Sequence, residues 1–154
     1  MNGDVVRDLL LALQGLQVTI LALHDWIPLG KLNDVKAVRA QDTLTQLLTV
    51  TAVQTVPFAF GLVCSVFYRY TPYPGWLYGW LWVSYGALFI GQIQAWWIPY
   101  LIRPQPKRAA RYQRVFGTTH SVLPVRNGIT PNTLHLMLHL ATLATLVLLG
   151  FEPR

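Results

Sequence analysis

The chain has 154 residues, of which 53% are hydrophobic and only 12% are charged, about half the charged share of a soluble domain. This balance excludes an ordinary soluble domain and is typical of an integral membrane protein. The single cysteine, Cys64, and the absence of a CxxC motif argue against thiol redox chemistry.

Four apolar segments are each long enough to cross a hydrocarbon layer of about 30 Å. We expect helices over residues 5–27, 43–69, 75–100 and 132–151, joined in the third connection by a long loop, 103–130. The loop contains a basic, amphipathic stretch that is typical of a short interfacial helix. The predicted fold class is therefore an all-α integral membrane protein, a four-helix transmembrane bundle with a short interfacial helix in the third loop. Residues 1–154 form its single domain.

Basic residues are concentrated in two of the connections, which explains the net charge of +6 without a nucleic-acid partner. Nine of the twelve lie there: Lys31, Lys36, Arg39, Arg103, Lys107, Arg108, Arg111, Arg114 and Arg126. Four helices place these two connections on one side, and Arg7, Arg69 and Arg154 on the other. The positive-inside rule then predicts a plasma (inner) membrane protein with both loops in the cytoplasm and both termini outside.

Each expected helix carries one polar stripe. The stripes are Gln14, Gln17, His24 and Asp25; Asp42, Gln46, Thr49 and Gln54; Tyr78, Tyr85, Gln92 and Trp96; and Asn132, His135, His139 and Thr142. Polar groups in lipid are costly, so we expect all four stripes to face the bundle interior. His135 and His139, four residues apart, then lie one and two turns below the cytoplasmic surface, at the level of His24 and Asp25.

The histidine cluster has three interpretations. In the first, His and Gln side chains only hydrogen-bond across helices and stabilise the bundle. In the second, they line a pocket that opens to the cytoplasm or the inner leaflet and binds an amphipathic or anionic small molecule or lipid. The candidate ligand-binding residues are Gln46, Gln54, Gln92, Trp96, Tyr100, Arg111, Arg126 and Asn132. In the third, His135 and His139 share a transition metal, completed by His24 or His120.

Three classes of function follow from these interpretations. An enzyme would act on a lipid or lipophilic molecule, with His135, His139 or His24 as the acid–base group and Asp25 as the orienting partner. A small oligomeric transporter would use histidine as its proton-responsive group. A metal-binding protein or a structural subunit of a larger membrane complex would need neither. We expect membrane lipids as partners, and a homo-oligomer is compatible with the sequence.

Overall fold

The computed structural model describes residues 3–152 and is all-helical, at 74% helix, with no β-strand in that range. The long elements are α1 (Gly3–Leu23), α3 (Leu44–Phe67), α4 (Gly75–Gln92) continuing into the π-helix η2 (Ile93–Ile102), and α6 (Thr133–Leu149). The short ones are η1 (Gly30–Leu32), α2 (Val35–Gln41) and α5 (Pro106–Phe116). Arg154, which entered the charge count above, lies outside the described residues.

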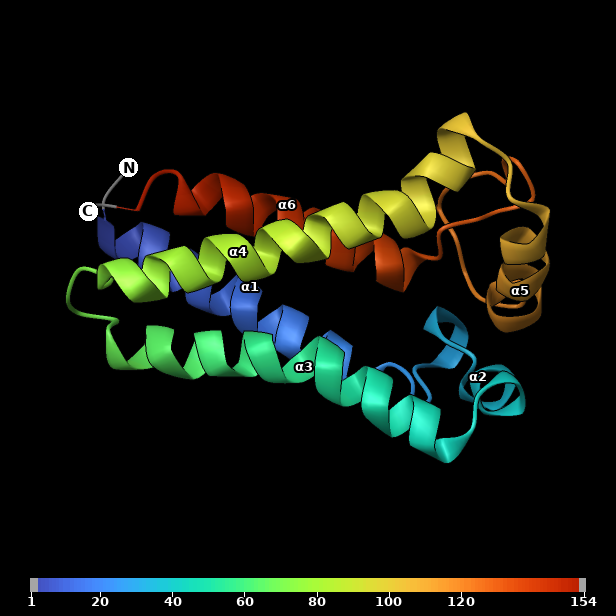
Figure 1. Ribbon diagram of the computed structural model, residues 1–154, viewed down its shortest axis with the longest axis horizontal. Helices are drawn as coiled ribbons and strands as arrows, with labels where there is room; N and C mark the ends of the chain where they lie inside the picture. Colours follow the sequence, from blue (N-terminus) through green and yellow to red (C-terminus); the bar gives the residue numbers. More distant parts are fainter. Residues whose placement is uncertain (1–2, 153–154) are drawn as a thin grey trace.

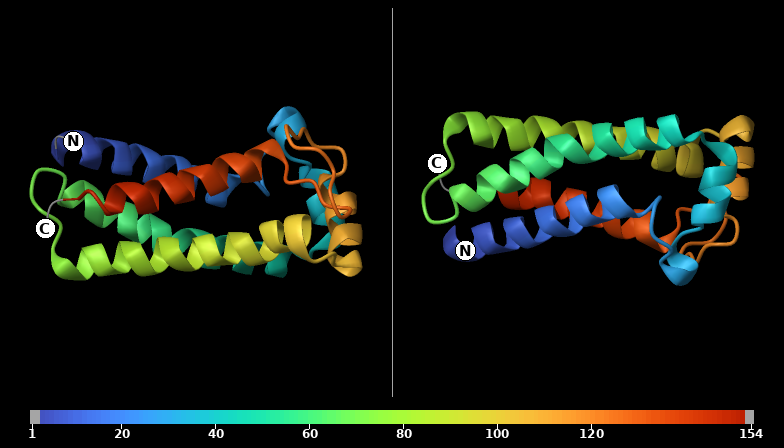
Figure 2. Two further views of the ribbon diagram at one scale, coloured as in Figure 1. Left: turned by 90° about the horizontal axis from the view of Figure 1, so that it is seen from above. Right: turned by 90° about the horizontal axis from the view of Figure 1, so that it is seen from below.

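The four long elements run along the long axis of the molecule (Figure 1). Helix α1 packs against α3 and α6, and α4 packs against α6 and α3. The short helices α2 and α5 contact each other at one end, here called the cap end. The start of α1 and the end of α6 lie together at the opposite, terminal end (Figure 2). Both long loops are thus on one side, as the sequence predicts.

Two helices, α1 and α3, are long and apolar enough to cross a membrane, and α6 is apolar but shorter. Length and composition alone are weak evidence for membrane association, because the core helix of a soluble protein can pass the same test. The distribution of side chains over the bundle adds a second observation. Val53, Val83 and Leu140 are 57–73% exposed on the outside, whereas Gln14 and Gln17 are fully buried.

Helix boundaries follow local capping chemistry. Thr43 caps α3 in a reciprocal capping box with Gln46, and Asn132 caps α6 by accepting from the backbone N–H of His135. The first helix ends at Leu23, four residues earlier than expected. Asn33 explains this, because its side-chain amide donates to the carbonyls of His24 and Ile27 beyond that end.

Pro99 explains how α5 is attached to the bundle. Proline has no backbone N–H, so it cannot bond to the carbonyl four residues before it, and the chain forms a π-helix here. The carbonyl of Ala95 instead accepts from Arg108 Nη1 at 2.9 Å and from the Tyr112 hydroxyl at 3.1 Å. The interfacial helix expected from the sequence is therefore turned inward: Tyr112 and Phe116 pack on Trp96 rather than projecting toward lipid.

Candidate functional site

Helices α1 and α6 face each other through polar side chains along their whole length. At the terminal end, Arg7 Nε donates to Glu152 Oε1 at 2.7 Å, with both side chains buried. Further along, Gln17 Nε2 donates to Thr145 Oγ1 at 2.9 Å. At the cap end, the His24 and His135 rings meet edge to face with centroids 5.8 Å apart. The inward orientation expected for all four stripes is observed for these two, whereas Gln46, Thr49 and Gln54 of α3 are exposed, so the expectation is wrong for that helix.

We call these polar contacts between α1 and α6 the polar seam. Helix α4 joins it through Gln92. The Thr142 hydroxyl donates to Gln17 Oε1 at 2.9 Å and accepts from Gln92 Nε2 at 3.0 Å. Three helices are thus linked by one chain of buried hydrogen bonds, which is the structural role that the first interpretation assigned to glutamine. Each such bond contributes roughly 0.5–2 kcal/mol in a membrane setting.

A cavity of about 340 Å³ lies between the helices next to this network, toward the cap end. We call it the histidine cavity. Its polar lining consists of His24, Gln54, Gln92, His135 and His139. Its apolar lining comes from Leu21, Ala87, Leu88, Gly91, Ala95, Trp96 and Leu138. Six of the residues predicted from sequence to form the site therefore share one cavity, with apolar walls and a few convergent polar groups.

Two buried polar atoms at this cavity have no hydrogen-bond partner within residues 3–152. They are Oε1 of Gln92 and Nδ1 of His139, on side chains that are about 95% buried in relative area. A buried polar atom without a partner costs about 1–3 kcal/mol. Since the rest of the Gln92 amide is well bonded, these atoms indicate positions where a ligand or water can bind.

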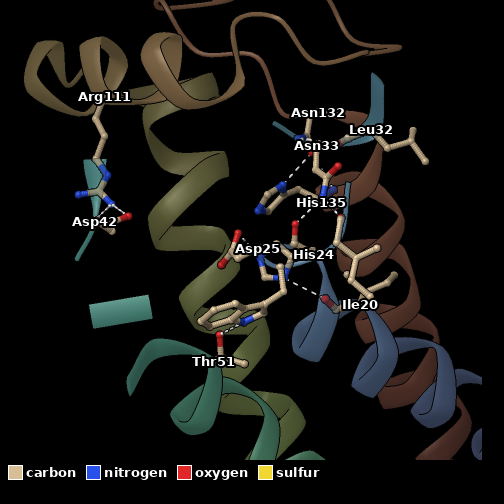
Figure 3. A network of polar contacts seen from close by, with 12 residues as sticks. Ile20, His24, Asp25, Leu32, Asn33, Asp42, Thr51, Arg111, Asn132 and His135 are labelled. Atoms are coloured by element: carbon tan, nitrogen blue, oxygen red, sulfur yellow. Dashed lines mark hydrogen bonds and ion pairs between the residues drawn. The ribbon is translucent and has the colours of Figure 1, made fainter. Parts of the chain in front are cut away.

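The hydrogen bonds of His135 determine which of its ring nitrogens carries the proton (Figure 3). Asn132 Oδ1 already accepts from the backbone N–H of His135 and lies 2.7 Å from its Nδ1. An amide oxygen can only accept, so Nδ1 carries a proton. In the neutral ring, Nε2 is then an acceptor, and His135 presents a fixed base to the cavity.

His24 and Asp25 form a different unit at the same level (Figure 3). His24 Nδ1 lies 2.8 Å from the carbonyl of Ile20, which can only accept, so this nitrogen is protonated. His24 Nε2 lies 3.3 Å from Asp25 Oδ1, an attractive contact only when a second proton lies between them. Burial raises the pKa of the Asp25 carboxyl, the His24 imidazole opposes the rise, and the Asp42 carboxylate adds to it. This contact therefore places a carboxyl with a raised pKa next to an imidazole nitrogen, at the level of His135.

Aromatic rings cover the cavity on the side of the cap. Trp96 packs against His135, Tyr112 and Phe116, with ring centroids 4.5, 4.3 and 5.3 Å apart. Phe116 also contacts His135 at 5.0 Å. Trp96, Tyr112 and Phe116 together form what we call the aromatic cover. These rings lie between the cavity and the cap, and the expectation that the pocket opens to the cytoplasm or the inner leaflet stays a prediction.

Three of the predicted site residues line a neighbouring cavity instead. Asp25, Gln46 and Arg111 border a space of about 320 Å³ near Asp42. Arg111 donates to both carboxylate oxygens of Asp42, at 2.8 and 2.9 Å (Figure 3). Gln46 is used by the capping box of α3. The Arg111 guanidinium thus has a structural partner, Asp42, that is distant in sequence, and the Gln46 amide has a local one, Thr43.

The remaining predicted residues have structural contacts and lie outside both cavities. The Tyr100 hydroxyl donates to the carbonyl of Pro124 at 3.0 Å. Arg126 is exposed and pairs through its backbone with Ile129 across the Asn127–Gly128 turn, whose two residues have positive φ as a type I′ turn requires. Asn132 acts on the cavity indirectly, by orienting His135.

The metal interpretation lacks a third ligand. Within residues 3–152, no three His, Cys, Asp or Glu side chains are grouped as metal ligands. His135 Nδ1 is already bonded to Asn132, and His120 is exposed and bonded to Thr133 Oγ1 at 2.7 Å. His135 and His139, with ring centroids 6.4 Å apart, are the only two of the proposed ligands on one helix.

Sequence reasoning missed two groups that shape the site. One is the aromatic cover, because the amphipathic pattern of α5 looks the same whether its apolar face meets lipid or protein. The other is Asn33, which holds the end of α1 and so places His24 and Asp25. An Asn-Asp pair before a short helix was the available signal for a cap, but not for a contact with α1.

No protein-family model, curated protein or solved structure matches the chain. The functional argument therefore depends on the geometry of the site alone.

Proposed function

We propose that the chain is a four-helix transmembrane bundle whose histidine cavity binds a small amphipathic molecule. The spanning elements are α1, α3, α4 with η2, and α6. The inverted distribution of side chains supports the membrane part of the proposal. Buried Gln14, Gln17 and Thr142 lie inside, while exposed valines and leucines cover the outside, and an exterior of this kind is typical of a surface in contact with lipid.

The orientation of the bundle follows from charge. Nine of the twelve basic residues belong to the connections at the cap end, so this end faces the cytoplasm and the terminal end faces outward across the plasma membrane. The histidine cavity then lies near the cytoplasmic interface. The buried Arg7–Glu152 pair lies near the outer one.

The two unpartnered atoms of Gln92 and His139 are the observation that carries the ligand part of the proposal. An amide oxygen accepts, so the complementary ligand group is a donor such as a hydroxyl. The apolar walls fit the aliphatic or aromatic body of the same molecule. An anionic head group is disfavoured, because neither Arg111 nor Arg126 lines the cavity.

Acid–base catalysis in the cavity is a second candidate function. Its support is the contrast between His135, which presents an acceptor nitrogen, and the His24–Asp25 pair, which holds a proton. In this role His135 accepts a proton from one atom of a bound ligand while the His24–Asp25 pair donates one to another atom of it. Turnover that is lost in His135→Gln while alcohol binding persists would favour this role. Turnover that survives the substitution would remove it.

Thermal unfolding of the detergent-purified protein with a long-chain alcohol tests the binding proposal. The alcohol should raise Tm, and a long-chain sulfonate of equal length should not. Gln92→Met should abolish the increase relative to its own Tm, whereas Gln94→Met should retain it, because Gln94 is exposed and outside the cavity. No increase in the wild type, or a larger one with the sulfonate, would contradict the proposal. An unchanged increase in the double variant His135→Gln, His139→Gln would show that the two histidines take no part in binding and only pack the bundle.

A further inference from the structure

Contacts between helices border the histidine cavity on several sides. Toward the cap, the aromatic cover lies over His135. Between α1 and α3, the Trp26 indole donates to Thr51 Oγ1 at 2.9 Å. Between α4 and α6, Gln92 bonds to Thr142. These contacts involve α3, α4, η2, α5 and α6, so several elements hold the cap half together around the cavity.

One side has no such contact. Gln54 of α3 and Ala87 and Gly91 of α4 all line the cavity, and all three are exposed. They are therefore the rim of an opening between α3 and α4. The two helices contact each other from the middle of the bundle, where the Phe58 and Tyr85 ring centroids are 5.1 Å apart, to the terminal side, where a Cβ on Gly61 would lie 3.0 Å from Leu81. In the view of Figure 1 they diverge from there toward the cap end.

The composition of the rim fits an entrance. Ala87 and Gly91 are small, and a Cβ built on Gly91 meets nothing within 4 Å. Gln54 is a polar side chain among the exposed Val53 and Val56 of α3. A glutamine facing lipid is costly, and here its amide can instead meet a polar head group that passes the rim.

On this basis, and depending on the transmembrane arrangement proposed above, we infer that the cavity takes its ligand sideways from the bilayer through the gap between α3 and α4. The ligand class is a lipid-dissolved molecule with a hydrogen-bond-donating head group. The head group reaches Gln92 and His139, and the apolar body remains near Ala87 and Gly91. A polar metabolite from the cytoplasm would instead have to displace the aromatic cover.

A photoreactive long-chain alcohol in proteoliposomes tests this route with the full chain. After a short illumination, peptide mass spectrometry should locate adducts on the α4 and α6 segments that line the cavity. Gly91→Leu adds a side chain at the rim, and its Cβ meets nothing within 4 Å. It should lower the initial rate of cavity labelling about tenfold, which corresponds to ~1.4 kcal/mol of added barrier.

Gly79→Leu is the matched control, because it makes the same change on the same helix, also has nothing within 4 Å, and lies away from the cavity. Its labelling rate should equal that of the wild type. Equal rates in Gly91→Leu and wild type would overturn the lateral route while leaving the binding proposal intact. Absence of cavity adducts in the wild type would instead contradict the binding proposal.

A second experiment on the route of entry uses the aromatic cover. If the ligand enters sideways, Phe116→Ala should not restore labelling to the Gly91→Leu variant. If entry is through the cap, removing the ring should speed labelling by a short, water-soluble photoreactive alcohol, and Gly91→Leu should have no effect on it. That second pattern would also overturn the lateral route.

Discussion

The two halves of the bundle use the same kinds of residues in different ways. In the terminal half, Gly61 lets α3 pack closely on α4, and the Arg7–Glu152 pair joins α1 to α6. In the cap half, α3 and α4 border a cavity. Buried polar atoms without partners occur in both halves, as Glu152 Oε2 in the terminal half and as His139 Nδ1 and Gln92 Oε1 beside the cavity. The difference teaches that polarity inside this bundle is no guide to function by itself. Buried polar atoms that border a cavity are the ones that indicate a binding site.

The largest effect is expected at the buried ion pair of the terminal half. Glu152→Leu leaves the Arg7 guanidinium buried without a partner, so the free energy of unfolding should fall by about 3–5 kcal/mol. The double variant Arg7→Met, Glu152→Leu should recover much of that loss. Chemical unfolding in mixed micelles would measure both. If the single and double variants were equally destabilised, the ion pair would not be the reason for the loss.

Close packing in the terminal half predicts a smaller effect at Gly61. A leucine there would collide with Leu81 and Trp80, so Gly61→Leu should lower stability by about 1–3 kcal/mol through overpacking. Gly91→Leu in the cap half should leave stability nearly unchanged, because its side chain enters open space. Equal losses measured by thermal unfolding would remove the contrast between the two halves.

The hydrogen bonds of Gln17, between the two halves, predict a loss of stability that is similar to that of Gly61→Leu or smaller. Gln17→Leu removes the partner of both Thr142 and Thr145, and should cost roughly 1–2 kcal/mol on the scale of membrane hydrogen bonds. Leu16→Gln, one residue away on the exposed face, is the matched control for side-chain chemistry. In a bilayer Leu16→Gln should also lower the stability, because it places an amide in lipid. A stabilised Gln17→Leu variant would show that this seam is not held by hydrogen bonds.

The smallest effect is expected in the cap, at Asp34. Its carboxylate accepts from the Ala37 N–H and the Thr118 hydroxyl, at 2.9 and 2.8 Å, and the Ala37 bond, followed by that of Thr118, lowers the pKa of this carboxyl. The stabilisation is therefore present above the usual aspartate pKa of about 3.9 and is lost as the pH falls through the lower folded value. Asp34→Ala should cost about 1 kcal/mol at neutral pH.

Hydrogen exchange of α2 measures this local stability. The protection factors of the α2 amides, which correct for the intrinsic pH dependence of exchange, should fall in the wild type on acidification to the folded pKa of Asp34, and those of Asp34→Ala should change little over the same interval. A variant that keeps the wild-type pH dependence would assign the effect to another group.

The sequence was sufficient for the helices and for the common face of His135 and His139. Uncharged apolar runs bounded by Pro28, Thr43 and Pro131 predict four long helices near their observed positions, and the spacing of His135 and His139 places them on one face. These features are local, so a periodicity of 3.6 residues determines them. The prediction of a transmembrane bundle at the plasma membrane extends beyond them and stays a proposal.

The partners of the predicted site residues could not be read from the sequence, because they depend on tertiary contacts. Arg111 finds Asp42, which is 69 residues away, and the aromatic cover forms because Pro99 frees the carbonyl of Ala95 to hold α5. Gln46 has a local explanation in the capping box with Thr43. Arg7 and Glu152, at opposite ends of the chain, carry no pattern that links them.

Spin-label accessibility in a lipid bilayer tests the central claim most directly, which is that the apolar exterior faces lipid while the polar seam lies inside. Labels at Val53, Val83 and Leu140, each on the outside of a different helix, should collide readily with oxygen and little with a water-soluble nickel chelate. A label at Lys36 in the cap should show the reverse. High nickel accessibility at the three outer positions would contradict the transmembrane arrangement, and with it the lateral entry of a ligand.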